Sequence, residues 1–257
     1  MLGLGNNLIH NNRIKRGGVV YDAAYQAVLD YATTQGYALP SDEQKLLQNQ
    51  LLIDLKSAGI WNKLDTFANF ATDGSSNFAL IDWKRLSLLT AVNSPTFTTN
   101  EGFTGNGTSS YINTNFNPSI GTNNYKLNNA SRYIYTLNVV ALFDGVELDV
   151  SNRMATAGTA QRINQGTGVI NSAYSFSIGA GMKSIHRTSS TNVELFSDTT
   201  QASRTATSSS VTNANQLISR SLTTYSANRV CMYAMGSSMI TENTDFVNAY
   251  NTYVNSL

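Results

Sequence analysis

The sequence is poor in the residues that build crosslinks and metal clusters. Its 257 residues include one cysteine, Cys231, and two histidines, His10 and His186. A single thiol cannot form a disulfide within the chain, and it excludes a zinc site built on several cysteines. Cys231 lies in the apolar stretch RVCMYAM, which is typical of a buried small side chain. Each histidine stands apart from other candidate ligands, so we expect neither to bind a metal.

Charge is also scarce, and it is nearly balanced. Only 13% of residues are charged, with 17 Lys and Arg against 16 Asp and Glu. General nucleic-acid binding usually requires a basic excess, so this balance argues against it. No apolar run is long enough to span a membrane, and the opening MLGLGNNLIHNNRIKRGG has no apolar core of signal-peptide length. We therefore expect a soluble protein made in the cytoplasm of its host cell, without membrane insertion.

The first 18 residues, here called the arm, combine glycines and asparagines with three cations and no acid. A disordered tail is one interpretation of such a composition. The other is an extended segment that becomes ordered against a partner protein. In that case the anchoring residues would be Leu8, Ile9, Arg13, Ile14, Lys15 and Arg16.

Residues 19–66 have the 3.6-residue apolar period of helices. A first helix is predicted from Val20 to Thr33. A second opens at Ser41, where Ser41 and Gln44 form a capping box. Gly59 then fits the left-handed position that follows a helix, and a short helical turn is expected after it.

From about Phe67 the apolar period changes to two, which predicts many short strands in residues 67–257. The candidate strands are NFALIDW, TFTTNEGF, SSYINTNF, RYIYTLNVVALF, GVELDV, AYSFSIGA, KSIHRT, NVELFS, NQLISRSL and RVCMYAM. The low-complexity stretch TTQASRTATSSS is predicted to be a surface loop. A closing helix is predicted after a Thr241 cap, with an apolar stripe of Phe246, Tyr250, Tyr253 and Leu257.

Three stretches resemble the concanavalin A-like, laminin G-type jelly rolls. EGFTGNGTSSYINTNFNPS (101–119) resembles an early strand pair of that fold, and KSIHRTSSTNVELFSD (183–198) resembles its arginine-bearing hairpin. The last stretch, from RVCMYAM to the end, is similar to its final strand and closing helix. The helical stretch GIWNKLDTFANFATDGSSNFALIDWK (59–84) and the MLGLG opening resemble tail, fibre or capsid-associated proteins of phages that infect Bacteroidota.

The resemblance implies a mainly β, concanavalin A-like jelly-roll sandwich with an N-terminal helical pair and a C-terminal helix. It also implies a virion structural protein that attaches to other virion proteins through the arm and presents the sandwich for host-surface glycan or receptor contact. A homo-oligomer, such as a trimer, is the expected assembly. A decoration protein without cell binding and a glycan-processing enzyme are the alternatives.

The stretch GVELDV bears on the enzyme alternative. Glu147 and Asp149 share one face of a predicted strand and resemble the start of the Glu-x-Asp-x-Glu signature of retaining β-glucanases. That signature ends in the acid/base carboxylate, whereas this chain has Ser151 or Asn152 there. We therefore predict no enzyme activity, and a solvent-exposed or ligand-contacting face instead.

Positive charge gathers in residues 151–240, which hold seven cations against Glu194 and Asp198. We predict either dispersed surface charge or a basic face for an acidic glycan or a neighbouring subunit. Arg187, with Glu147 and Asp149, is the candidate face. Six tyrosines could form sugar-stacking platforms, although most should pack inside: Tyr111, Tyr125, Tyr133, Tyr135, Tyr174 and Tyr225. No cofactor is predicted. Calcium is the one ion considered, with oxygens from Asp73 and Asp144, both in Asp-Gly turns.

Overall fold

The computed structural model describes residues 19–138, 142–146, 152–155, 161–165, 176 and 179–257. The predicted arm, residues 1–18, lies outside the described residues. No helix in the described ranges is both long enough and apolar enough to cross a membrane.

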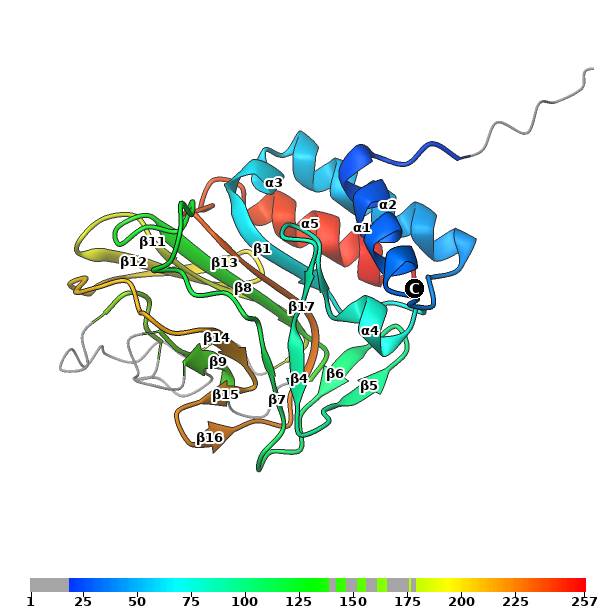
Figure 1. The fold of residues 1–257 in the computed structure, drawn as a ribbon. Coiled ribbons are helices and arrows are strands. Elements are labelled where there is room, and N and C mark those ends of the chain that lie inside the picture. The colour runs from blue at the N-terminus through cyan, green and yellow to red at the C-terminus, as the bar shows by residue number, and fades with distance from the viewer. Residues whose placement is uncertain (1–18, 139–141, 147–151, 156–160, 166–175, 177–178) are drawn as a thin grey trace, which may run out of the picture.

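Two helices open the described chain, as the sequence predicts (Figure 1). Helix α1 (Ala23–Thr34) begins at Asp22, whose carboxylate accepts a hydrogen bond from the Ala24 amide at 2.9 Å. Helix α2 (Asp42–Ser57) begins at Ser41, whose hydroxyl accepts from the Gln44 amide at 3.2 Å. These side chains satisfy amides that a helix end leaves without partners, so both starts are fixed locally.

The prediction of a complete capping box is wrong, because the Gln44 side chain does not accept from the Ser41 amide. The Gln44 side chain is buried and accepts a hydrogen bond from the Thr72 hydroxyl at 2.9 Å. The Ser41 amide donates instead to Asp73 at 3.0 Å. Gln44 therefore joins the helix to the loop after the first strand instead of closing the helix on itself.

A left-handed glycine leads from the helices into the sheet. Gly59 has a φ of 72°, as predicted, and precedes the short helix α3 (Ile60–Lys63). Strand β1 (Leu64–Asn69) follows at once and pairs antiparallel with β17 (Arg229–Gly236), the strand that ends near the closing helix.

Strand β17 is central in the larger sheet. It pairs with β8 (Ala130–Thr136) on one side and with β1 and β6 (Gly102–Thr104) on the other. The order along the sheet is β13-β12-β11-β8-β17-β6-β5, all antiparallel. Its other strands are β5 (Thr96–Thr98), β11 (Gly181–Arg187), β12 (Asn192–Ser197) and β13 (Thr200–Thr205).

A smaller antiparallel sheet has the order β10-β9-β14-β7-β4. Its strands are β4 (Thr90–Val92), β7 (Tyr111–Asn113), β9 (Leu142–Val146), β10 (Met154–Ala155) and β14 (Gln216–Ile218). Two small hairpins complete the fold. β2 (Ile81–Asp82) pairs with β3 (Ser87–Leu88) beside β1 of the larger sheet, and β15 (Arg220–Ser221) pairs with β16 (Thr224–Tyr225) beside β9 of the smaller sheet.

The larger sheet lies between two interiors. On one face, α1, α2 and α5 (Asn243–Val254) cover it, and their buried side chains form a helix-side core with Tyr133, Tyr135 and Met232 (Figure 1). On the other face, Ile134, Ile185 and Tyr233 meet Ile112 and Ile218 of the smaller sheet in a sandwich core. This antiparallel sandwich with two N-terminal helices and a C-terminal helix confirms the predicted fold class.

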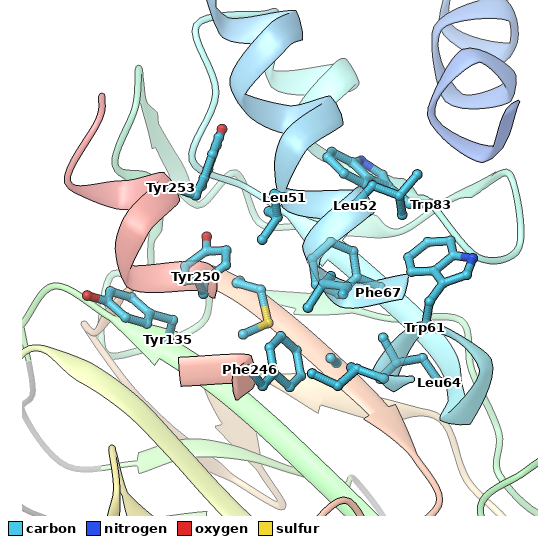
Figure 2. Packing of buried hydrophobic residues seen from close by; sticks show 14 of the residues in the cluster. Leu51, Leu52, Trp61, Leu64, Phe67, Trp83, Tyr135, Phe246, Tyr250 and Tyr253 are labelled. Atoms are coloured by element: carbon cyan, nitrogen blue, oxygen red, sulfur yellow. The ribbon is translucent and has the colours of Figure 1, made fainter. Parts of the chain in front are cut away.

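The helix-side core is rich in aromatic rings (Figure 2). The ring of Phe67 lies 5.4 Å from that of Trp83 and 6.0 Å from that of Trp61, both edge-on, and 6.4 Å from that of Phe246. Such offset and edge-on contacts add to the stabilisation from burying each ring. The predicted apolar stripe of the closing helix is confirmed at Phe246, Tyr250 and Tyr253, which are buried.

Three local predictions are wrong, each for a physical reason. NFALIDW begins with a helical turn, α4 (Ser76–Ala79), because the Ser75 hydroxyl accepts from the Phe78 amide at 3.2 Å. The predicted loop at 199–210 contains β13, which forms because β12 offers it a pairing edge. The N-cap position of the closing helix is Glu242 instead of Thr241, and the Glu242 carboxylate accepts from Lys63 and makes no cap hydrogen bond. Leu257 lies beyond the end of this helix, 37% exposed.

Candidate functional site

Most of the predicted site residues lie outside the described residues. This applies to Glu147, Asp149 and Tyr174, and to the anchoring residues of the arm. Of the candidate ligand face, only Arg187 is described, and it is fully buried. Every residue of β11 is buried, because helix α5 and the smaller sheet cover the two faces of the larger sheet. The alternation in KSIHRT therefore does not produce an exposed basic face, and a ligand contact of Arg187 stays a prediction.

Arg187 belongs to an arginine trio that holds a neighbouring chain segment. Arg132 on β8 donates to the carbonyl of Arg162 at 3.0 Å, and Arg187 donates to the carbonyl of Ile163 at 2.8 Å. Arg204 on β13 donates to the carbonyl of Gln161. Three strands of the larger sheet thus donate to three consecutive carbonyls, and the Arg162 carbonyl also accepts from the Arg153 amide, so these buried acceptors are satisfied.

The electrostatics of the trio reflect burial and mutual repulsion. Burial lowers the pKa of Arg187, and burial together with the nearby guanidinium groups of Arg187 and Arg162 lowers the pKa of Arg204 to about 10. Arg187 and Arg204 stay protonated at neutral pH. Their observed contacts indicate that they position residues 161–163 on the sheet.

Asp144, one of the two aspartates considered for calcium, is fully buried in the sandwich. Its Oδ2 lies 3.4 Å from Nη1 of Arg132 and accepts a hydrogen bond from the Tyr233 hydroxyl at 3.1 Å. Burial raises the pKa of this carboxyl, and Arg132 opposes that shift. The other aspartate, Asp73, accepts from the Ser41 amide. Across the described part of the chain, no three His, Cys, Asp or Glu side chains come together as a metal site would require.

His186 and Cys231 are buried and have structural contacts. His186 Nδ1 accepts from the Met239 amide at 3.3 Å, and its Nε2 lies 3.0 Å from the Ser184 hydroxyl. Burial lowers the pKa of His186 to about 3, so the ring is neutral at physiological pH. Burial raises the pKa of the Cys231 thiol, which makes it unreactive. The prediction of a buried small side chain at Cys231 is confirmed.

The described tyrosine candidates divide into buried and partly exposed. Tyr125, Tyr133 and Tyr135 are buried, as most were expected to be. Tyr111 and Tyr225 are partly exposed, and the Arg220 guanidinium stacks on both rings, at 4.7 and 5.3 Å from their centroids. Their inner faces are occupied by this arginine, so they do not form an open aromatic platform.

A groove on the sandwich surface presents many side-chain amides. It has a volume of about 320 Å³ and lies where β7 leads into the following loop. We call it the asparagine groove, and it is lined by Arg85, Asn115, Phe116, Asn117, Ile120, Asn123 and Asn215.

Local hydrogen bonds give the asparagine groove its shape. Asn113 accepts from the Asn115 amide at 2.9 Å, and Asn115 adopts a left-handed φ of 54°, a conformation that asparagine tolerates well. Asn117 donates to Asn213 at 2.9 Å, which joins this loop to the one before β14. Asn123 donates to the carbonyl of Ile120 at 2.8 Å and closes the loop end.

Arg85 fixes the inner wall of the groove. Its Nε donates to Asp82 at 2.5 Å, and its Nη1 donates to the Asn115 carbonyl at 2.9 Å. The guanidinium lies 5.4 Å from the centroid of the Phe116 ring. Ile120, 66% exposed, supplies apolar surface. The amide nitrogens of Asn115 and Asn123 already donate within the chain, so these side chains offer a ligand their carbonyl oxygens, which suit an uncharged, hydroxyl-rich ligand.

The asparagine groove was not predicted from the sequence. The stretch NTNFNPSIGTNN carries five of its seven lining residues and is dense in asparagine, which was the available signal. Arg85 and Asn215 are distant in sequence, and only the fold brings them to this loop.

The described chain belongs to the class of mainly β, antiparallel sandwich proteins. No family model and no curated protein matches it. Among solved structures, it is similar to the Trypanosoma rangeli sialidase in complex with sialic acid, with 10% identity and a TM-score of 0.48 over 81% of this chain and 40% of the sialidase.

Two further solved structures are similar, also with low sequence identity and a TM-score below 0.5. Domain 4 of an extracellular GH43 arabinanase from Geobacillus stearothermophilus, in complex with arabinotriose, has 12% identity and a TM-score of 0.42, covering 72% of this chain and 98% of that domain. The binding domain of botulinum neurotoxin serotype D has 8% identity and a TM-score of 0.48, covering 75% and 53%. The chain spans about two fifths of the length of the sialidase.

Proposed function

We propose that this protein is a structural component of a phage virion whose sandwich contacts a host-surface glycan through the asparagine groove. The observation that carries the glycan contact is the groove itself, where side-chain amides surround apolar Ile120 and the Arg85–Phe116 stack. Sugar hydroxyls can donate to the amide carbonyl oxygens of the groove, while the apolar face of a sugar ring is matched by Ile120.

The virion part of the proposal is supported by the sequence. A low charge content, the resemblance to phage tail, fibre or capsid-associated proteins, and a basic arm all favour it. In this proposal, the arm attaches the protein to the particle, and the sandwich is presented outward. A homo-oligomer would multiply weak glycan contacts by avidity.

The glycan contact is tested by binding of the purified protein to capsular polysaccharide from the host. Asn215→Ala and Ile120→Ala should each weaken binding about tenfold, or roughly 1.4 kcal/mol. Asn255→Ala and Leu257→Ala are the controls, since both residues are exposed and neither lines the groove. Equal binding by all four variants would contradict a role for the groove.

The same samples distinguish binding from cleavage. We expect no new reducing ends during prolonged incubation with the polysaccharide. Sustained release of reducing ends would support the glycan-processing alternative. For the virion role, deletion of residues 1–18 should abolish incorporation into particles, and intact incorporation would refute the anchoring role of the arm.

A further inference from the structure

A second surface, on the opposite side of the molecule from the sandwich core, lacks a described partner. A shallow groove of about 430 Å³ runs between α2 and α5. It is lined by Asp54, Ser57, Ala58, Asp245, Asn248, Ala249 and Thr252. A smaller cavity continues it toward Leu47 and Gln50 and shares Asp54, Ala249 and Thr252. The lining includes two carboxylates and no cation.

Exposed apolar side chains border this groove. Leu46 is 48% exposed and Ile53 is 36% exposed, both on α2. Leu46, Gln50, Ile53 and Ser57 follow one another at spacings of four, three and four residues, so they form one strip along the helix. Because Gln50 and Ser57 line the cavities, Leu46 and Ile53 lie at the border of the groove. We call the strip and the groove together the α2–α5 surface.

The arm has the complementary chemistry. It holds Arg13, Lys15 and Arg16 with no acid, and it holds the apolar residues Leu8, Ile9 and Ile14. Cations of the arm match Asp54 and Asp245, and its apolar residues match Leu46 and Ile53. The asparagine groove does not match the charge of the arm, because it is lined by the cation Arg85 and by no acid.

The described start of the chain leads away from the helices. Val20 is 92% exposed, and residues 19–22 extend outward from α1 (Figure 1). Eighteen residues can span roughly 60 Å when extended, which is enough to reach a neighbouring molecule of this size. The virion proposal adds that many copies lie close together on a particle.

We propose that the arm of one copy docks on the α2–α5 surface of a second copy. This inference rests on the proposed anchoring role of the arm, and it names a partner for it. Each copy donates one arm and accepts another through a different surface, so the contact is head-to-tail and builds rings or arrays.

The proposed docking is tested with two variants, one that can only donate an arm and one that can only accept an arm. The donor variant Asp54→Lys keeps the arm and alters the surface, and the acceptor variant lacks residues 1–18 and keeps the surface. In light scattering, the wild-type protein should associate with rising concentration, and each variant alone should stay monomeric. An equimolar mixture should form a complex of one donor and one acceptor, which weakens at high salt.

Asp30→Lys is a closely matched control. Asp30 accepts from Gln26 at 2.8 Å on α1, just as Asp54 accepts from Gln50 at 2.8 Å on α2, and both bonds lie at the surface. The two substitutions remove the same kind of contact and change the charge equally. Asp30→Lys should associate like the wild type. Wild-type association by Asp54→Lys would overturn the proposal.

Three further results would test the docking of the arm on a second copy. A donor–acceptor mixture that stays monomeric would overturn docking between copies. If the wild-type protein stayed monomeric and deletion of residues 1–18 increased amide exchange in α2 and α5, the arm would instead dock on its own chain, which would also overturn the proposal. Loss of particle incorporation by the deletion, with a monomeric mixture, would refute this inference and leave the anchoring role intact.

Discussion

Neighbouring residues of β8 enter two different interiors. Tyr135 points into the helix-side core, where it meets Tyr250 (Figure 2), and Tyr133 meets Phe246 in the same core. Arg132, next to Tyr133 in the sequence, instead lies in the sandwich beside Asp144. Aromatic burial stabilises one face of the sheet through area and shape, which tolerate gradual change. The other face adds buried charges and carbonyls, which depend on individual partners.

The largest effect is expected on the helix-side core. Phe67 is fully buried and lies among the rings of Trp61, Trp83 and Phe246. Phe67→Ala should lower the free energy of unfolding by about 4 kcal/mol, since it removes apolar contact and leaves a cavity. Phe67→Leu should cost less than half as much. Urea denaturation of both variants measures the difference, and equal losses would contradict packing as the cause.

A near-isosteric change should be almost as costly in the sandwich. Asp144→Asn conserves shape but removes the carboxylate beside buried Arg132, so we expect a loss of about 3 kcal/mol. Combining it with Arg132→Met should restore part of that stability, because the uncompensated cation is removed as well. If Asp144→Asn unfolded at the wild-type urea concentration, the proposed contrast between the two faces would be wrong.

A smaller, pH-dependent effect should come from His186. Its pKa is about 3 in the folded state, below the ordinary value of 6.5, so the unfolded chain binds more protons between these values. Stability should therefore fall as the pH drops below about 6.5, by up to roughly 1.4 kcal/mol per pH unit. His186→Phe should flatten this slope between pH 4 and 6. His10→Ala should keep it, and an unchanged slope in His186→Phe would exclude His186 as its source.

Much of the fold could be predicted because local chemistry fixes it. The Ser41 cap, the left-handed Gly59 and the apolar stripe of α5 act within a few residues, and the structure has all three. β13 was not predicted, because its polar sequence becomes a strand only where β12 offers an edge.

The candidate site was less predictable for the same reason. Arg187 follows the alternation of an exposed strand, yet both faces of β11 are covered by parts of the chain distant in sequence. The asparagine groove depends on the meeting of Arg85, the loop after β7 and Asn215, which no local pattern encodes. Residue chemistry predicted a polar ligand, whereas the groove proposed to bind it is formed only by the tertiary structure.

The most direct test of the central claim is a side-chain amide NMR titration of asparagine-labelled protein with the host capsular oligosaccharide. We predict saturable shifts of Asn115, Asn117, Asn123 and Asn215, with Asn255 and Asn49 unchanged. Shifts confined to residues outside the groove, with these four signals unmoved at saturation, would contradict glycan contact through the asparagine groove.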